Sequence, residues 1–167
     1  VARISASGAV IAAAYQSGRV VLWDAARGVL LRTIETGHAL INVAVDATGG
    51  KVASTHMNGS IRIWNAASGD LLRSIDAHRG MVAFASFSHD GVRLVSAGED
   101  QTAKVWAVGS GELLLEMRGH EAEVSAAAFS PSGRYILTAS FDAKAILWDA
   151  NTGARLQTYV GPSNAII

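Results

Sequence analysis

The chain has 167 residues, of which half are hydrophobic and 17% are charged, and this composition is typical of one core-rich globular domain. Fourteen Lys and Arg residues balance 14 Asp and Glu residues, so there is no net positive charge to indicate nucleic acid or an anionic membrane surface as a partner. The absence of cysteine excludes disulfides and thiolate metal sites, and no apolar run approaches the roughly 20 residues of a membrane-spanning helix.

A repeat of about 42 residues organises the whole chain. Trp23, Trp64, Trp106 and Trp148 follow one another at spacings of 41, 42 and 42 residues. Glycines recur 15 positions before and five positions after each tryptophan, and glycine suits hairpin turns because it adopts positive φ without a Cβ clash. A period of this length, with short apolar runs between turn residues, indicates stacked four-stranded sheets. We therefore predict four repeats, at about residues 1–36, 37–76, 77–118 and 119–160.

Each repeat contains short β-branched and apolar runs, bounded by Gly, Ser and Asp, that predict strands. In the first repeat these runs are Val1–Ile4, Ala9–Ala14, Arg19–Trp23 and Val29–Ile34. In the second they are Val43–Val45, Val52–Thr55, Ile61–Trp64 and Leu71–Ile75. In the third they are Val82–Phe87, Arg93–Ser96, Ala103–Trp106 and Leu113–Met117. The fourth begins with Val124–Phe129 and closes near Arg155–Tyr159, and no helix of normal length is predicted.

The fourth repeat carries the most complete motif, Gly119-His120 followed 28 residues after the histidine by Trp148-Asp149. This pattern resembles the signature of the WD-repeat β-propellers, and the resemblance covers essentially all of the chain. It implies an all-β fold, a β-propeller array of four WD-type four-stranded blades that form part of a larger ring. The innermost strands are then expected to be buried on both faces, because blades stack around an axis.

The C-terminal segment Val160–Ile167 reads as the start of a fifth repeat, with Pro162 in the histidine position. Aligned on the tryptophans, Ile167 stops one position before the frame at which Val1 starts. We therefore expect the four repeats to be completed by additional blades of a longer chain or by a second copy.

If the ring is open, a flat blade face is uncovered at each end of the array. Ile4 and Val10 are expected to face water at one end, and Leu147 and Tyr159 near the other. Contiguous apolar surfaces of this kind normally mark an interface.

The resemblance also implies a buried hydrogen-bond network in each blade, in which an aspartate, a histidine, a hydroxyl group and the tryptophan indole follow one another. Two repeats carry the full set, which is His78, Ser96, Asp100 and Trp106 in the third and His120, Thr138, Asp142 and Trp148 in the fourth. The second repeat has His38, Ser54, Asn58 and Trp64, so its network loses a charge. The first has Ala13 and Ser17 at two of the positions and lacks the network. Blade stability is therefore expected to fall toward the N-terminus.

Ser96, His78 and Asp100 also match the residue types of a hydrolase triad. No G-x-S-x-G motif surrounds Ser96, and the set recurs with threonine in place of serine, which favours the structural role. His38, His78 and His120 lie one repeat apart, without the clustered ligands that a metal site requires. We therefore expect no catalytic residue, no metal site and no cofactor.

The surface with functional potential is the face that carries the turns between second and third strands, which the resemblance places at the upper rim of the ring. Its candidate partner-binding residues are Gln16, Met57, Glu99, Phe141, Arg79 and Glu121. Met57 and Phe141 are apolar where a simple turn would be polar, and Phe141 either anchors a partner or packs on a neighbouring loop. The leading hypothesis is a non-enzymatic scaffold for proteins or peptides. The alternative is a sensor or regulatory module of a larger ATPase, kinase or protease.

Overall fold

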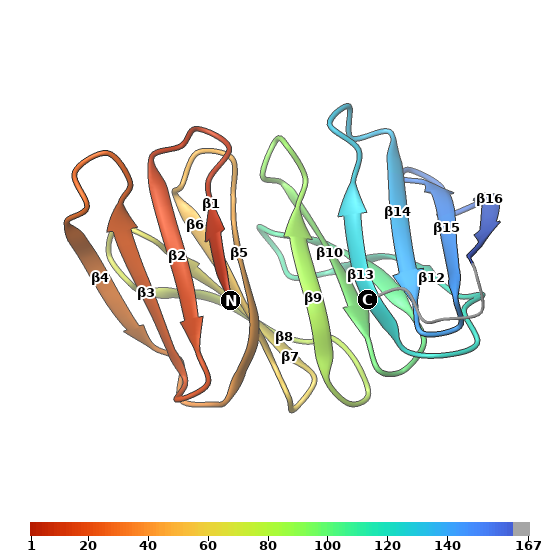
Figure 1. Cartoon of the computed structure of the whole chain (residues 1–167), viewed down its shortest axis with the longest axis horizontal. Coiled ribbons are helices and arrows are strands. Elements are labelled where there is room, and N and C mark those ends of the chain that lie inside the picture. Colours follow the sequence, from red (N-terminus) through yellow and green to blue (C-terminus); the bar gives the residue numbers. More distant parts are fainter. Residues whose placement is uncertain (162–167) are drawn as a thin grey trace.

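The computed structural model describes residues 1–161, which form four antiparallel sheets of four strands each (Figure 1). Blade 1 contains β1 (Ala2–Ile4), β2 (Val10–Tyr15), β3 (Arg19–Asp24) and β4 (Leu30–Glu35). Blade 2 contains β5 (Leu40–Val45), β6 (Lys51–His56), β7 (Ser60–Asn65) and β8 (Leu71–Asp76). Blade 3 contains β9 (Val82–Phe87), β10 (Arg93–Gly98), β11 (Ala103–Ala107) and β12 (Leu113–Met117). Blade 4 contains β13 (Val124–Phe129), β14 (Tyr135–Ser140), β15 (Lys144–Asp149) and β16 (Arg155–Val160).

Within each blade the strands follow their order in the chain, so every sheet is a simple meander. The blades lie side by side along an arc (Figure 1), and the predicted all-β array of four-stranded propeller blades is confirmed. No helix in the described part of the chain is long and apolar enough to cross a membrane. The predicted start of a fifth repeat, with Pro162 and Ile167, lies outside the described residues.

The hydrophobic core consists of three clusters, and each cluster lies between two consecutive blades. Ala12, Val20 and Leu22 of blade 1 pack with Val43, Val52 and Trp64 of blade 2. In the same way, Trp106 packs with side chains of blade 2, and Trp148 packs with side chains of blade 3. Each of these tryptophans therefore faces the preceding blade. Because every cluster is shared, a blade buries its apolar surface only when it has a neighbour.

The two outward faces of the arc remain uncovered. Trp23 of blade 1 is half-buried, whereas Trp64, Trp106 and Trp148 are 6%, 5% and 2% exposed. Ile4, which shares this face with Trp23 through the register of β1, β2 and β3, is 60% exposed. This matches the expectation of an apolar face open to water.

The opposite end of the arc exposes blade 4. Tyr159 is 51% exposed and Leu137 is 48% exposed, while Leu147 is half-buried between them. The expectation for Val10 is wrong, since Val10 packs against the cluster between blades 1 and 2. Its side chain points away from Ile11 because neighbouring residues of a strand alternate between faces.

Glycines occupy the turn positions that require a left-handed backbone. The eight glycines in the two columns fixed relative to tryptophan have φ between 66° and 82°. The turn between second and third strands needs the same conformation in every blade, five residues before tryptophan. Gly18 and Gly59 supply it in blades 1 and 2, whereas Gln101 (φ 66°) and Ala143 (φ 62°) adopt it in blades 3 and 4. Those two positions carry a strain that glycine would not.

The innermost strand of blade 2 begins earlier than the apolar pattern indicated. β5 starts at Leu40 instead of Val43, with a register shift between Leu40 and Asn42. Asn42 is buried, and its side-chain oxygen accepts a hydrogen bond of 2.7 Å from the backbone N–H of Val43. Its own backbone N–H donates to the hydroxyl of Thr55 at 3.0 Å. A polar residue enters the strand because its hydrogen bonds are satisfied locally.

Candidate functional site

Blade 3 contains a chain of buried hydrogen bonds that joins four polar side chains. The indole N–H of Trp106 donates to Ser96 Oγ at 2.9 Å, and Ser96 Oγ lies 2.7 Å from His78 Nε2. His78 Nδ1 lies 2.8 Å from Asp100 Oδ1. A neutral histidine with its proton on Nδ1 satisfies every group, since it donates to the carboxylate and accepts from the serine hydroxyl.

Electrostatics keep the His78–Asp100 pair in this protonation state. Burial lowers the pKa of His78, although the neighbouring Asp100 opposes the shift. Burial acts to raise the pKa of Asp100, but hydrogen bonds from Thr102 and His78 outweigh it and hold that pKa at about 2. The second carboxylate oxygen accepts the backbone N–H of Arg79 at 3.2 Å. Asp100 therefore ties the turn before β11 to the loop before β9.

Blade 4 repeats the arrangement with a threonine hydroxyl. Trp148 Nε1 donates to Thr138 Oγ1 at 2.9 Å, and Thr138 Oγ1 lies 2.8 Å from His120 Nε2. His120 Nδ1 lies 2.9 Å from Asp142 Oδ2, which also accepts the backbone N–H of Glu121 at 2.9 Å. The structure thus brings together both complete sets of residues identified in the sequence.

Blade 2 differs from the prediction, because His38 is not part of its network. His56 takes the histidine position instead, with Nε2 at 3.0 Å from Ser54 Oγ, while Trp64 Nε1 donates to the same oxygen at 2.9 Å. Ser54 and His56 are two residues apart on β6, so their side chains lie on the same face of the sheet. His38 is exposed in the preceding loop, with its ring edge-on to His56 at 6.1 Å between centroids.

The reason is steric and can be seen by comparing blades 2 and 3. The position of His56 corresponds to Gly98 in blade 3, where an added Cβ would lie 2.3 Å from His78 Nδ1. A side chain as large as histidine at this position therefore competes with a histidine from the loop for one space, whereas the small Ser140 at the same position of blade 4 leaves room for His120. The sequence did contain a signal for this difference, because His56 stands at the position where blade 3 has Gly98.

Asn58 also lies outside the blade 2 network. Its side-chain oxygen accepts hydrogen bonds from the hydroxyl and the backbone N–H of Ser60, at 2.7 and 3.2 Å. His56 Nδ1 makes no hydrogen bond of normal geometry. Burial, together with the positive charge of Arg62, lowers the pKa of His56 from 6.5 to about 4. Blade 2 therefore holds a neutral, fully buried histidine without a carboxylate.

The environment of Ser96 is unsuited to nucleophilic chemistry. The side chain is fully buried, and its oxygen is already engaged by Trp106 and His78. A nucleophile must reach a substrate carbon, and no surface leads to this oxygen. Among residues 1–161, no group of three or more His, Cys, Asp or Glu side chains is placed to hold a metal ion.

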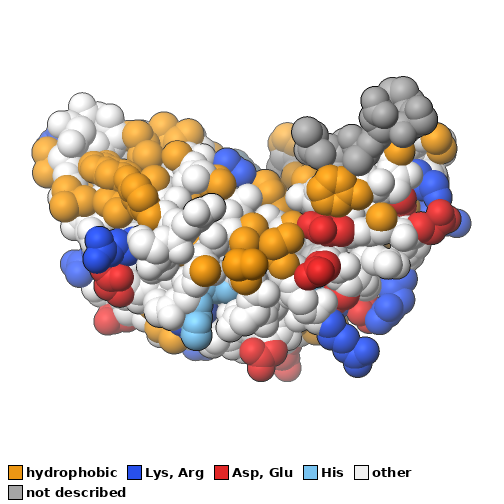
Figure 2. Space-filling view, turned by 60° about the horizontal axis from the view of Figure 1, so that its bottom comes forward, with side chains coloured by type: hydrophobic (Ala, Val, Ile, Leu, Met, Phe, Trp, Pro, Cys, Tyr) orange, Lys and Arg blue, Asp and Glu red, His pale blue; other side chains and the backbone are white. Residues whose placement is uncertain are grey.

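The six candidate rim residues are all exposed and lie at one end of the molecule. Met57 is 61% exposed and Phe141 is 44% exposed, each in the turn between the second and third strands of its blade. Gln16 and Glu99 occupy the corresponding turns of blades 1 and 3. Arg79 and Glu121 come directly after the network histidines, in the loops before β9 and β13. Figure 2 is turned toward this end and shows apolar patches separated by acidic and basic side chains.

Several rim residues are held in place by backbone and ionic contacts. Glu99 accepts the backbone N–H of Met81 at 3.0 Å, and Glu121 forms an ion pair with Lys144 at 2.9 Å. The backbone N–H of Phe141 donates to the carbonyl of Glu123 at 3.1 Å. Burial and the nearby Glu99 raise the pKa of Glu123. The networks of blades 3 and 4 thus end directly beneath the exposed turns of Glu99 and Phe141, which pre-organises this part of the surface.

Four meander blades, shared inter-blade cores and tryptophan-linked histidine networks define a WD-repeat β-propeller array. Comparison with known families agrees with this class. The model described as "WD domain, G-beta repeat" matches residues 111–149, and the model described as WDR54 matches residues 2–125. The second match spans more than half of the chain, so the chain belongs to the WDR54 family of WD-repeat proteins. None of the curated proteins matches it. WD-repeat propellers mediate protein interactions and are typically non-catalytic, and the chain is a protein-interaction scaffold of this general kind.

Proposed function

We propose that the chain is a non-enzymatic platform that binds proteins or peptides on the rim formed by Gln16, Met57, Glu99, Phe141, Arg79 and Glu121. The observation that carries the proposal is the exposure of Met57 and Phe141, which are 61% and 44% exposed in the turns between second and third strands. The hydrogen bond between His120 and Asp142 holds the turn of Phe141 from below. Exposed apolar groups within a charged border are the arrangement of an interface anchor.

Two further observations support the absence of catalysis. The hydroxyl of Ser96 is fully buried, and the same network recurs in blade 4 with threonine in place of serine. Purified chain should not hydrolyse p-nitrophenyl acetate faster than buffer does. An esterase activity that Ser96→Ala abolishes would contradict the proposal.

Peptides selected from a random displayed library on the immobilised chain provide the test for the rim. Selected peptides should lose at least about tenfold in affinity when Phe141→Ser or Met57→Ser is introduced, since buried anchors carry most of the binding free energy. The matched control is Leu156→Ser, which removes an equally exposed leucine (48%) from the outer strand of blade 4. Peptides that bind all three variants as well as the parent would contradict the rim assignment. The alternative, a regulatory module of a larger signalling enzyme, would use the same rim.

We also propose that the uncovered faces of blades 1 and 4 receive blade faces of the complementary type. The exposed face of blade 4 corresponds to the face of blade 3 that packs under Trp148, and the exposed face of blade 1 carries Trp23. Inside the array, the face of each blade that carries the tryptophan packs on the preceding blade. The exposed face of blade 1 could therefore pack on a surface like the exposed face of blade 4. Further blades of a longer chain or a second copy would supply them.

A further inference from the structure

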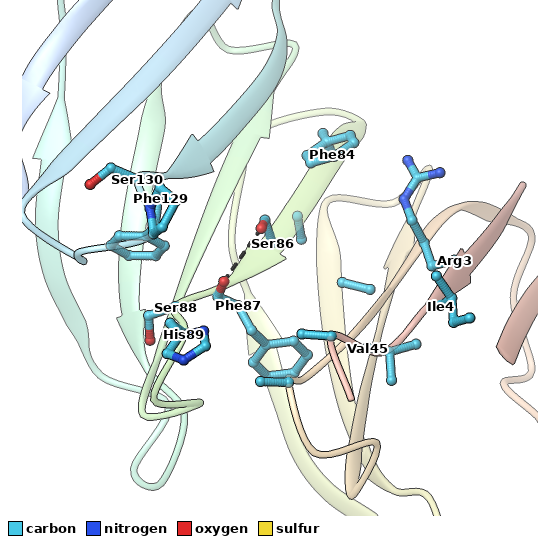
Figure 3. A pocket seen from close by; sticks show the side chains of 15 residues that line it. Arg3, Ile4, Val45, Phe84, Ser86, Phe87, Ser88, His89, Phe129 and Ser130 are labelled. Carbon is cyan, nitrogen blue, oxygen red and sulfur yellow. Dashed lines mark hydrogen bonds between the residues drawn. The ribbon is translucent and has the colours of Figure 1, made fainter. Parts of the chain in front are cut away.

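The end of the molecule opposite the rim contains a cavity of about 360 Å³ on the axis of the array. Inner strands and first turns of all four blades line it, and Figure 3 shows their side chains around a common space. Consecutive turns of a meander lie at opposite ends of its strands, so this axial pocket is separate from the rim. It is therefore a feature that the proposed function does not use.

The wall of the axial pocket comes from one column of the repeat. The residue 19 positions before each tryptophan is Ile4, Val45, Phe87 or Phe129, and all four line the cavity. Phe84 from β9 adds a third aromatic ring. The three phenylalanines are only half-buried, so parts of their rings remain open to a ligand. An apolar or aromatic side chain would find complementary surface there.

One cation faces the same space. The guanidinium of Arg3 lies 5.4 Å from the ring centroid of Phe84, which belongs to β9. It also donates a hydrogen bond to the backbone carbonyl of Ala2 at 3.0 Å. Arg3 forms no ion pair with any residue between 1 and 161. His89 stands exposed at the lip of the pocket. The guanidinium keeps donors available for an anionic group.

No carboxylate neutralises this charge from the described residues that line the pocket. The nearest turns do carry two aspartates, but both are engaged elsewhere. Asp46 accepts the hydroxyl of Thr48 at 3.1 Å and lies 3.7 Å from Lys51 Nζ. Asp90 accepts the hydroxyl of Ser88. The pocket therefore combines an aromatic wall with a positive charge.

We propose that the axial pocket binds a peptide that presents an apolar or aromatic side chain directly beside a carboxylate. The side chain packs against Phe84, Phe87 and Phe129, and the carboxylate pairs with the guanidinium of Arg3. The guanidinium of an arginine can donate two parallel N–H···O hydrogen bonds to the two oxygens of a carboxylate. A neutral or cationic group cannot accept this charge-assisted pair of bonds. The carboxylate belongs either to a peptide C-terminus or to an Asp or Glu side chain.

Three short probes separate these sources in NMR titrations of the ¹⁵N-labelled chain. They are acetyl-Gly-Gly-Phe with a free C-terminus, the same peptide as its C-terminal amide, and acetyl-Gly-Phe-Asp-amide. At least one carboxylate peptide should shift resonances of Phe84, Phe87 and Phe129, and it should bind at least about tenfold tighter than the amide, because charge-assisted hydrogen bonds are the stronger class. Whichever carboxylate peptide binds tighter identifies the source.

The variant Arg3→Gln should reduce the affinity for the tighter carboxylate peptide to that of the amide, and it should leave the weak binding of the amide unchanged. Arg27→Gln is the matched control, since it removes an exposed charge from the same blade away from the pocket. Equal affinities of acid and amide would overturn the proposal. So would unchanged binding by Arg3→Gln, or shifts confined to Met57 and Phe141 on the rim.

Discussion

Acidification from pH 7 to pH 4.5 should destabilise blade 2 through one residue, His56. Its pKa is about 4 in the folded chain and 6.5 in the unfolded chain, because burial and the charge of Arg62 oppose protonation. Between these values the unfolded chain binds more protons than the folded chain. The contribution of His56 to stability is therefore fully present above pH 6.5 and is lost as the pH falls toward 4.

The magnitude follows from the two pKa values. Integrating the proton uptake between pH 7 and pH 4.5 gives a loss of about 2.5 kcal/mol in the free energy of unfolding. Asp100 contributes little to this change, because the stability from its lowered pKa is lost mainly as the pH falls from its usual value of 3.8 toward about 2, below this window. His78, whose pKa is also lowered, titrates in the parent chain and in any His56 variant alike.

Urea unfolding followed by tryptophan fluorescence at several pH values measures this loss. The comparison is His56→Gln, which does not titrate and retains a group able to hydrogen-bond Ser54. The difference in unfolding free energy between parent and variant should shrink by about 2.5 kcal/mol as the pH falls from 7 to 4.5. Parallel pH profiles for the two proteins would refute the assignment of His56 as a neutral, buried member of the network.

Two further predictions concern the networks and the open ends of the array. Asp142→Ala should lower the free energy of unfolding by about 3 kcal/mol, because it leaves His120 buried without its partner. Ser96→Ala should lower the same free energy by about 1 kcal/mol. Unchanged thermal melts for both variants would contradict the structural role of the networks. In light scattering the purified chain should form dimers or larger species as its concentration rises, and Leu137→Lys should weaken this association by placing a charge on the uncovered face of blade 4. A stable monomer at all concentrations would contradict that expectation.

The repeat pattern alone determined the class of fold. Tryptophans at a fixed period, two glycine columns and short apolar runs depend only on local geometry and on the need of each blade for a neighbour. The networks of blades 3 and 4 could be assigned residue by residue because the resemblance to the WD-repeat propellers implied them. Both blades keep an aspartate, a histidine, a hydroxyl side chain and a tryptophan at the same spacing, with a small residue, Gly98 or Ser140, in the column of His56.

Only the tertiary structure decided which histidine enters the network of blade 2. The alignment of the repeats assigned His38 to the network, but His56 lies beside Ser54 and His38 lies edge-on to His56. Which histidine takes this place depends on the packing of a loop against β6. The axial pocket is likewise a product of assembly. Arg3, Phe84 and Phe129 come from three different blades. Phe129 belongs to a column of the repeat, but the sequence does not show that this column encloses a cavity. Local patterns predict what each blade is, whereas the stacking of blades decides which side chains meet.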